Sequence, residues 1–217
     1  MKKLISIYWI PLVLIISLNL YQGITYYIAK LTPFNETVVG GNVDNYISFQ
    51  PAWVVFYLLW HPLLILVPCF FYKFSKKSFY LYFTTVFLID TVAFLIFFFY
   101  PTILVRPEFE VTGLFTWALN LVYLGDTPAV NCLPSIHCTT CFLFIFCSIV
   151  NKVIPKIWKY ACILVASLII VSTVFVKQHA VIDIIGSLVV SSTLFIVVYK
   201  YKIHEKIYAK IEKEKDH

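Results

Sequence analysis

The feature that most constrains this chain is a series of six long apolar runs separated by short polar segments. The runs cover about residues 4–21, 52–72, 79–99, 136–152, 160–176 and 180–199. A helix needs about 20 mainly apolar residues to cross a bilayer, and the runs reach or approach that length. The sequence therefore predicts an all-α, polytopic membrane protein folded as a six-transmembrane-helix bundle.

Composition supports a membrane protein over a soluble one. Hydrophobic residues make up 61% of the chain and charged residues only 13%, whereas about a quarter of a soluble domain is charged. The length of 217 residues suits a single membrane domain over residues 1–217. A net charge of +6 would suit a nucleic-acid partner in a soluble protein, but here the basic residues gather between apolar runs. We therefore expect no nucleic-acid partner.

Two of the apolar runs need individual interpretation. The first follows Lys2 and Lys3 like a signal peptide, but it is long and no small-residue cleavage site follows, so we interpret it as a retained anchor. The fourth is short, because its apolar part is Ile136–Val150, and we expect it to borrow a further turn beyond Val150. Between the third and fourth runs, Leu114–Leu124 is amphipathic and aromatic, which is typical of a helix lying in the membrane interface.

The basic residues predict the orientation of the bundle. All but three of the 17 lysines and arginines lie in residues 2–3, 73–77, 152–159 and 200–217. The other three are Lys30, Arg106 and Lys177. By the positive-inside rule, both termini are cytoplasmic and residues 200–217 form a charged cytoplasmic tail. We therefore predict a multi-pass protein of the cell membrane with an outward-facing active site, because the polar loops fall on the other side.

Three polar clusters lie at the ends of apolar runs. The turn 131–138 carries Ser135 and His137 into the fourth run, where free backbone N–H groups and the helix dipole favour an anion such as phosphate. Residues 177–183 open the sixth run in the same way, and Arg106 follows the third. The question for the structure is whether these clusters meet.

The residue types in these clusters suit phosphoryl transfer. His179 and Asp183 are four residues apart on one helical face, so the carboxylate can orient the imidazole and raise its basicity. His179 is then a nucleophile and His137 an acid for the leaving oxygen. The predicted phosphate-binding residues are Arg106, Ser135 and Lys177. The scheme passes through a phosphohistidine and needs no metal or other cofactor, because cations and amide dipoles meet the developing charge.

Other interpretations of these residues stay open. Paired ionisable groups also occur in structural networks. A disulfide between Cys132 and Cys138 is one open alternative. A zinc site formed by these two cysteines with His137 and Cys141 is another, although their spacing matches no usual zinc site. His61 and Asp90 lie inside apolar runs, where we interpret them as packing residues, even though an intramembrane carboxyl group is a functional candidate by default.

The order of the motifs resembles the phosphatidic acid phosphatase type 2 superfamily. The matching residues are Arg106-Pro107, then Pro134-Ser135-x-His137, then Ser172 followed by His179-x-x-x-Asp183. The resemblance implies a six-span enzyme that acts on a membrane lipid phosphate through a phosphohistidine. It also implies His179 as nucleophile, Asp183 as its orienting group, His137 as acid, and Arg106 and Ser135 as phosphate ligands.

Three departures from the family pattern modify this expectation. Phe99 and Thr173 stand where the family usually has a lysine and an arginine, and Ile136 replaces a glycine. The chain therefore looks closer to the branch of inositol-phosphorylceramide and sphingomyelin synthases, which move a phospho-headgroup to an alcohol. We expect a lipid phosphatase or phosphotransferase; the alternatives are a headgroup transferase of that synthase type and a non-catalytic protein that binds or passes lipid.

Overall fold

The computed structural model describes residues 2–31 and 36–213, with only the backbone for residues 2–8, 10, 212 and 213. Its helices are α1 Lys2–Lys30, α2 Asn42–Asn45, α3 Val54–Phe74, α4 Lys76–Phe99, α5 Leu114–Gly125, α6 Ile136–Val150, α7 Lys156–Phe175, α8 Val181–Lys200 and α9 Ile203–Lys213. The strands are β1 Thr37–Val39 and β2 Thr102–Leu104.

The predicted helical membrane protein is confirmed at the level of helix length and composition. Among the residues described, five helices are long and apolar enough to cross a bilayer, over residues 11–30, 51–74, 76–99, 156–175 and 181–200. Two shorter apolar helices, α5 and α6, accompany them. The protein is therefore a multi-pass membrane protein by the length and apolarity of its helices.

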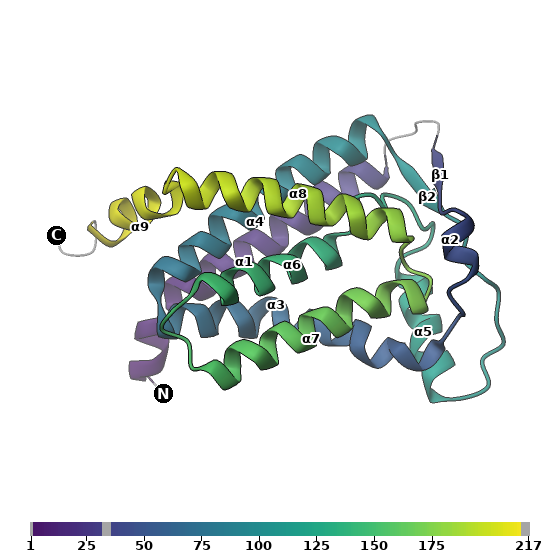
Figure 1. Ribbon diagram of the computed structural model, residues 1–217, viewed down its shortest axis with the longest axis horizontal. Coiled ribbons are helices and arrows are strands. Elements are labelled where there is room, and N and C mark those ends of the chain that lie inside the picture. Colours follow the sequence, from purple (N-terminus) through teal and green to yellow (C-terminus); the bar gives the residue numbers. More distant parts are fainter. Residues whose placement is uncertain (1, 32–35, 214–217) are drawn as a thin grey trace.

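The long helices and α6 all run between the same two ends of the molecule. The start of α1, α9 and the α3–α4 and α6–α7 connections lie at one end, at the left of Figure 1. The elements α2, α5, β1 and β2 lie at the other end. The basic segments 73–77 and 152–159 thus share an end with the start of α1 and with α9, and the polar loops share the opposite end.

Helix α6 is the centre of the bundle. It packs against α4, α7 and α8, and its core side chains Cys138, Leu143 and Phe144 are completely buried. Residues of one continuous apolar core surround it, including Phe71, Tyr82 and Ile169. Neighbouring helices cover α6, which has 15 residues, on several sides. Less of its surface is therefore left to face lipid than in a helix at the periphery of the bundle.

The predicted extension of α6 beyond Val150 is wrong. Asn151 leaves the helix in an extended conformation, with ψ at 120°. Its side-chain oxygen accepts hydrogen bonds from the backbone N–H groups of Val153 and Ile154, and its amide donates to Ser78. Since short polar side chains compete for the backbone in this way, the helix ends at Val150 and not at residue 152.

Other boundaries and one element class also differ from the prediction. Helix α1 continues from the predicted end at residue 21 to Lys30, with the Thr25 hydroxyl donating to the carbonyl oxygen of Tyr21. The all-α prediction missed the parallel pairing of β1 with β2. The described part of the charged tail forms α9, which packs on α4 and α8, and His204 in it is buried. Residues 214–217 of that tail lie outside the described residues.

Strand β2 fixes the turn that leads into α6. The Thr102 hydroxyl accepts hydrogen bonds from the backbone N–H groups of Cys132 and Leu133, at 2.9 and 3.1 Å, and its carbonyl accepts one from Asn131. Asn131 has a positive φ of 58°. The small sheet therefore holds the residues immediately before the start of α6.

Candidate active site

The first histidine lies in the opening turn of α6. Ser135 is the N-cap of this helix, and its hydroxyl oxygen accepts a hydrogen bond from the backbone N–H of Cys138 at 3.2 Å. This is the usual role of a serine at a helix start. It fixes His137 two residues later, at the end of the bundle that carries the polar loops.

The second histidine lies in the turn between α7 and α8. Lys177, two residues beyond the end of α7, has a left-handed backbone with φ at 52°. The backbone N–H groups of Gln178 and His179 both donate to the Thr173 carbonyl. Asp183 follows in the first turn of α8, completely buried. Its Oδ2 accepts a hydrogen bond from the Ala180 N–H at 2.9 Å and lies 3.3 Å from His179 Nδ1. The predicted pairing of His179 with Asp183 is thus present.

Small residues on α8 bring it close to α6. The Ser187 and Ser191 hydroxyls donate to carbonyls one turn earlier in α8, at 2.6 Å. They also lie 3.1 and 3.3 Å from the backbone carbonyls of Ser135 and Thr139 at the start of α6. At Gly186 an added Cβ would lie 2.4 Å from a methyl of Leu133. Close helix approach of this kind is what small and hydroxyl-bearing residues allow in membrane bundles. It brings the starts of the two helices, and therefore the two histidines, together.

The imidazole rings of His137 and His179 face a common space. Their ring centroids are 5.9 Å apart. The His137 ring also packs against Tyr57 and Trp60 of α3, with centroids 4.5 and 4.0 Å away. His137 Nε2 is buried and has no hydrogen-bond partner in the structure as described. The hydrogen-bonding capacity of this buried nitrogen is therefore unused among the described residues.

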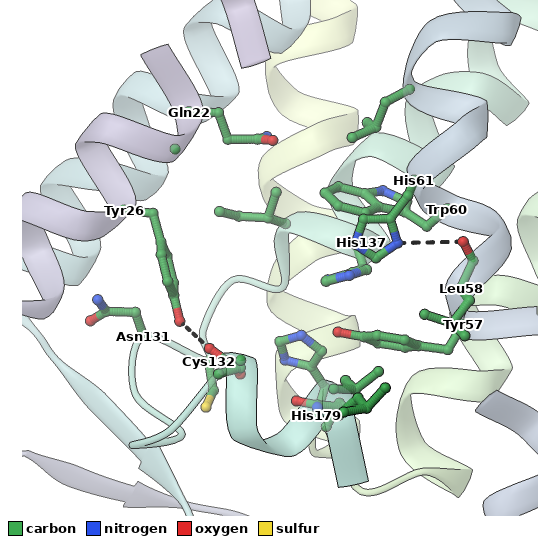
Figure 2. A pocket seen from close by; sticks show the side chains of 18 of the residues that line it. Gln22, Tyr26, Tyr57, Leu58, Trp60, His61, Asn131, Cys132, His137 and His179 are labelled. Atoms are coloured by element: carbon green, nitrogen blue, oxygen red, sulfur yellow. Dashed lines mark hydrogen bonds between the residues drawn. The ribbon is translucent and has the colours of Figure 1, made fainter. Parts of the chain in front are cut away.

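The space that they face is a cavity of about 690 Å³. Its walls come from α1, α3 and α5, and both histidines lie on its surface together with Gln178 and His61. Figure 2 shows α1 side chains on one side and α3 side chains on the other, with His137 and His179 between them. Most of the lining is apolar, which is typical of sites that bind a largely apolar ligand at a few polar groups.

Arg106 lies outside the lining of this cavity, in the wall of a second one with Glu108 and Tyr123, and its side chain is engaged by protein groups. Its guanidinium donates to the backbone carbonyl of Asp126 at 2.9 Å, to the Asp126 carboxylate, and to the side-chain oxygen of Gln178. It also lies over the ring of Tyr123, 4.7 Å from the centroid. Gln178 precedes His179 in the chain, so the hydrogen bond from Arg106 to Gln178 links Arg106 to the turn that carries His179.

The other two predicted phosphate ligands have different roles in this structure. The ammonium group of Lys177 donates to the backbone carbonyls of Asp44 and Ile47, at 2.7 and 2.6 Å, and Lys177 does not line the cavity. Ser135 is completely buried and caps α6. The structure therefore brings His137 and His179 to one cavity with Arg106 beside it, but it places Lys177 in the contact between α2 and the start of α8.

The structure also places the cysteines for which a disulfide and a zinc site were considered. Cys132 and Cys138 are free thiols. The Cys132 thiol donates to the Ala129 carbonyl at 3.3 Å, and burial, followed by the negative charges of Asp183 and Asp126, raises its pKa well above the ordinary value. Over residues 2–31 and 36–213, no group of three or more His, Cys, Asp and Glu side chains is arranged to hold a metal.

Sequence reasoning missed the contributions of α1 and α3 to the cavity. Asn19, Gln22 and Tyr26 line it from α1, and their spacing of three and four residues places them on one helical face. That spacing of polar residues in an apolar run was a readable signal. His61, interpreted as a packing residue, also lines the cavity, with its ring 6.3 Å from that of His137. No local pattern predicts that proximity.

Comparisons with protein-family models, with curated proteins and with solved structures gave no significant match for this chain.

Proposed function

We propose that this protein is a membrane lipid phosphatase or phosphotransferase that cleaves a lipid phosphoester through a phosphohistidine. The observation that carries the proposal is the convergence of two imidazoles on one apolar-walled cavity, with rings 5.9 Å apart. One of them is hydrogen-bonded to a buried carboxylate from the same helix start. The cavity suits a ligand with hydrocarbon chains and a single polar end.

His179 is the nucleophile in this proposal. A hydrogen bond from Nδ1 to Asp183 holds the tautomer whose Nε2 carries the free lone pair. That lone pair forms a bond to phosphorus while the bond from phosphorus to the leaving oxygen breaks. His137 gives its proton to that oxygen. In the second step water or an alcohol attacks phosphorus, His137 takes up the nucleophile's proton, and the bond between nitrogen and phosphorus breaks to restore His179.

Charge on the phosphate is met mainly by Arg106, with Gln178 as a neutral donor. Gln178 Nε2 and Arg106 Nε are both buried without a hydrogen-bond partner in the described part of the chain. Buried donors of this kind gain most from an anionic ligand, since a buried N–H group without a hydrogen bond costs free energy. Lys177 has no phosphate role in the proposal, because two backbone carbonyls already hold its ammonium group.

The ion pair of Arg106 with Asp126 favours a headgroup transferase as the second candidate. It leaves less net positive charge at the site than a free arginine would. A phosphodiester carries one negative charge and a monoester carries up to two, so the diester tolerates this site better. The diester reaction would move a phospho-headgroup to an alcohol, as the resemblance to the synthase-like branch implies.

The proposal places six spans in the membrane, by adding α6 to the five long helices. The helices α1, α3, α4, α6, α7 and α8 run between the two ends of the molecule, and the basic segments gather at one of them (Figure 1). By the positive-inside rule, that end is cytoplasmic and the cavity opens on the outer side.

The test is rapid quench of the purified protein with a lipid labelled at phosphorus. The label is expected on His179 in the wild type, while phosphate release or headgroup exchange distinguishes phosphatase from transferase. His204, which lies in α9 outside the cavity, provides the control, and His204→Gln should still trap label. Lipid binding with no label and no turnover would favour the non-catalytic alternative, since fold alone does not establish activity.

A further inference from the structure

A polar side chain also enters the cavity from α1. The Gln22 amide lines the cavity and extends from the helix into it (Figure 2). Its nitrogen donates a hydrogen bond to Asp90 Oδ1 at 3.0 Å. A glutamine amide has two N–H groups and a carbonyl oxygen, so one N–H and the oxygen stay available to a ligand.

Asp90 holds this amide from outside the cavity. It lies on α4, is only 3% exposed and is not part of the cavity lining. Its second oxygen, Oδ2, has no hydrogen-bond partner among the residues described. A carboxyl group within a membrane span is costly to keep, and its hydrogen bond to Gln22 gives it a defined task, which is to fix the direction of the amide.

The position of Gln22 along α1 indicates which part of a lipid it meets. Gln22 lies eight residues before Lys30, the last residue of the helix, which corresponds to about 12 Å along the axis. One turn nearer that end, the Tyr26 hydroxyl donates to Asp126 at 2.7 Å, and Asp126 binds Arg106. Gln22 therefore lies deeper in the bundle than the charged groups, at the level of the segment that joins a lipid phosphate to its chains.

We propose that Gln22, positioned by Asp90, binds a hydrogen-bonding group in that joining segment; the inference rests on the proposed function for the identity of the ligand as substrate. Glycerolipids and sphingolipids carry ester, amide or hydroxyl groups there, whereas an isoprenyl phosphate carries only hydrocarbon. An apolar chain against Gln22 would leave a desolvated amide unpaired, and sites of this kind reject ligands that lack the matching group. The protein therefore selects glycerolipid- or sphingolipid-type phosphates over isoprenyl phosphates.

The experiment compares phosphatidic acid with farnesyl phosphate in mixed detergent micelles. Binding is followed by tryptophan fluorescence, since Trp60 and Trp117 line the cavity, and turnover is measured in parallel. Gln22→Leu should weaken phosphatidic acid binding and kcat/KM by about tenfold, the scale of one lost hydrogen bond, and should leave farnesyl phosphate unchanged or improved. Asp90→Leu should act in the same direction, while Asp90→Asn, which keeps an oxygen acceptor, should restore most of the selectivity.

The matched control is the neighbouring hydrogen bond between the same two helices. The hydroxyls of Tyr21 on α1 and Thr91 on α4 are hydrogen-bonded at 3.0 Å, and both residues lie outside the cavity lining. Tyr21→Phe should therefore leave the binding and turnover of both lipids unchanged. If Gln22→Leu loses the binding selectivity but the wild type turns over neither lipid, the Gln22 site is supported and the proposed enzymatic function is wrong. Equal losses for both lipids, or no loss for phosphatidic acid, would overturn the Gln22 proposal.

Discussion

The two histidines lie in different surroundings, and their surroundings predict different losses on substitution. His179 bonds to Asp183 at 3.3 Å, whereas His137 packs between Tyr57 and Trp60 with its Nε2 unpaired. His179→Ala should abolish turnover, since no covalent intermediate forms. His137→Ala should keep activity towards a nitrophenyl phosphate, whose leaving group needs no proton. Steady-state rates with lipid and nitrophenyl substrates check this; a His179→Ala protein that still turns over would remove the assignment.

Arg106 is the predicted phosphate ligand that the proposed function retains, and its removal should be costly. Arg106→Ala should lower kcat by at least about a hundredfold, the usual scale for losing one transition-state donor. Arg106→Lys should recover little, because an ammonium group cannot reproduce the fork that meets Asp126 and Gln178 together. The rates are measured on folded protein, with Lys30→Met as the control, since Lys30 lies 4.0 Å from the same carboxylate. A kcat of Arg106→Ala close to the wild-type value would show that Arg106 does not bind the phosphate.

Local spacing in the sequence was enough to identify the pair His179 and Asp183, because four residues along a helix fix their relation. It was not enough for the cations. Arg106 and Asp126 are 20 residues apart, and Lys177 meets carbonyl groups 130 and 133 residues earlier in the chain. Such partners depend on how the loops fold over the bundle, and no periodic pattern encodes them.

At the scale of elements, α2 acts as a strap on the start of α8. Asp44 Oδ1 accepts a hydrogen bond from the Val181 N–H at 2.8 Å, and Lys177 binds the Asp44 and Ile47 carbonyls. Lys177→Met should therefore lower the melting temperature and reduce the rate severalfold, as expected when two hydrogen bonds from a charged group are lost.

The size of that effect separates a strap from a phosphate ligand. Asp44→Ala should mimic Lys177→Met, because both release the same helix start, while neither should approach the loss expected for Arg106→Ala. Thermal unfolding and kcat are the measurements. A Lys177→Met protein with an unchanged melting temperature and a kcat lowered a hundredfold or more would instead support Lys177 as a phosphate ligand.

Helix class and approximate position were predictable from the apolar runs, but the ends of the elements were not. The end of α6 is set by the hydrogen bonds of Asn151 to the following turn and to Ser78, and the last of these crosses 73 residues of sequence. The pairing of β1 with β2 likewise joins segments far apart in the chain. A three-residue strand has too short a pattern to be recognised alone.

At the scale of the whole molecule, the basic segments and both described chain ends gather at one end of the bundle (Figure 1). A reporter fused after His217 should be active only if it works in the cytoplasm, because loops rich in lysine are retained there. A second fusion within residues 107–112, at the other end, should give the opposite result. A periplasmic or extracellular signal from the C-terminal fusion would reverse the orientation.

The shortness of α6 has a consequence for kinetics. Its 15 residues extend for roughly 22 Å, less than the hydrocarbon thickness of about 30 Å. In the proposed six-span arrangement the α6–α7 connection lies at the inner surface, so we expect His137, at the start of α6, to lie beneath the outer surface. A lipid substrate, as proposed, would then reach the histidines while its chains stay in the leaflet, and enzyme and substrate would meet by diffusion within the membrane plane. We expect the rate to follow the mole fraction of substrate in the membrane, and to be unchanged when the same vesicles are diluted in buffer.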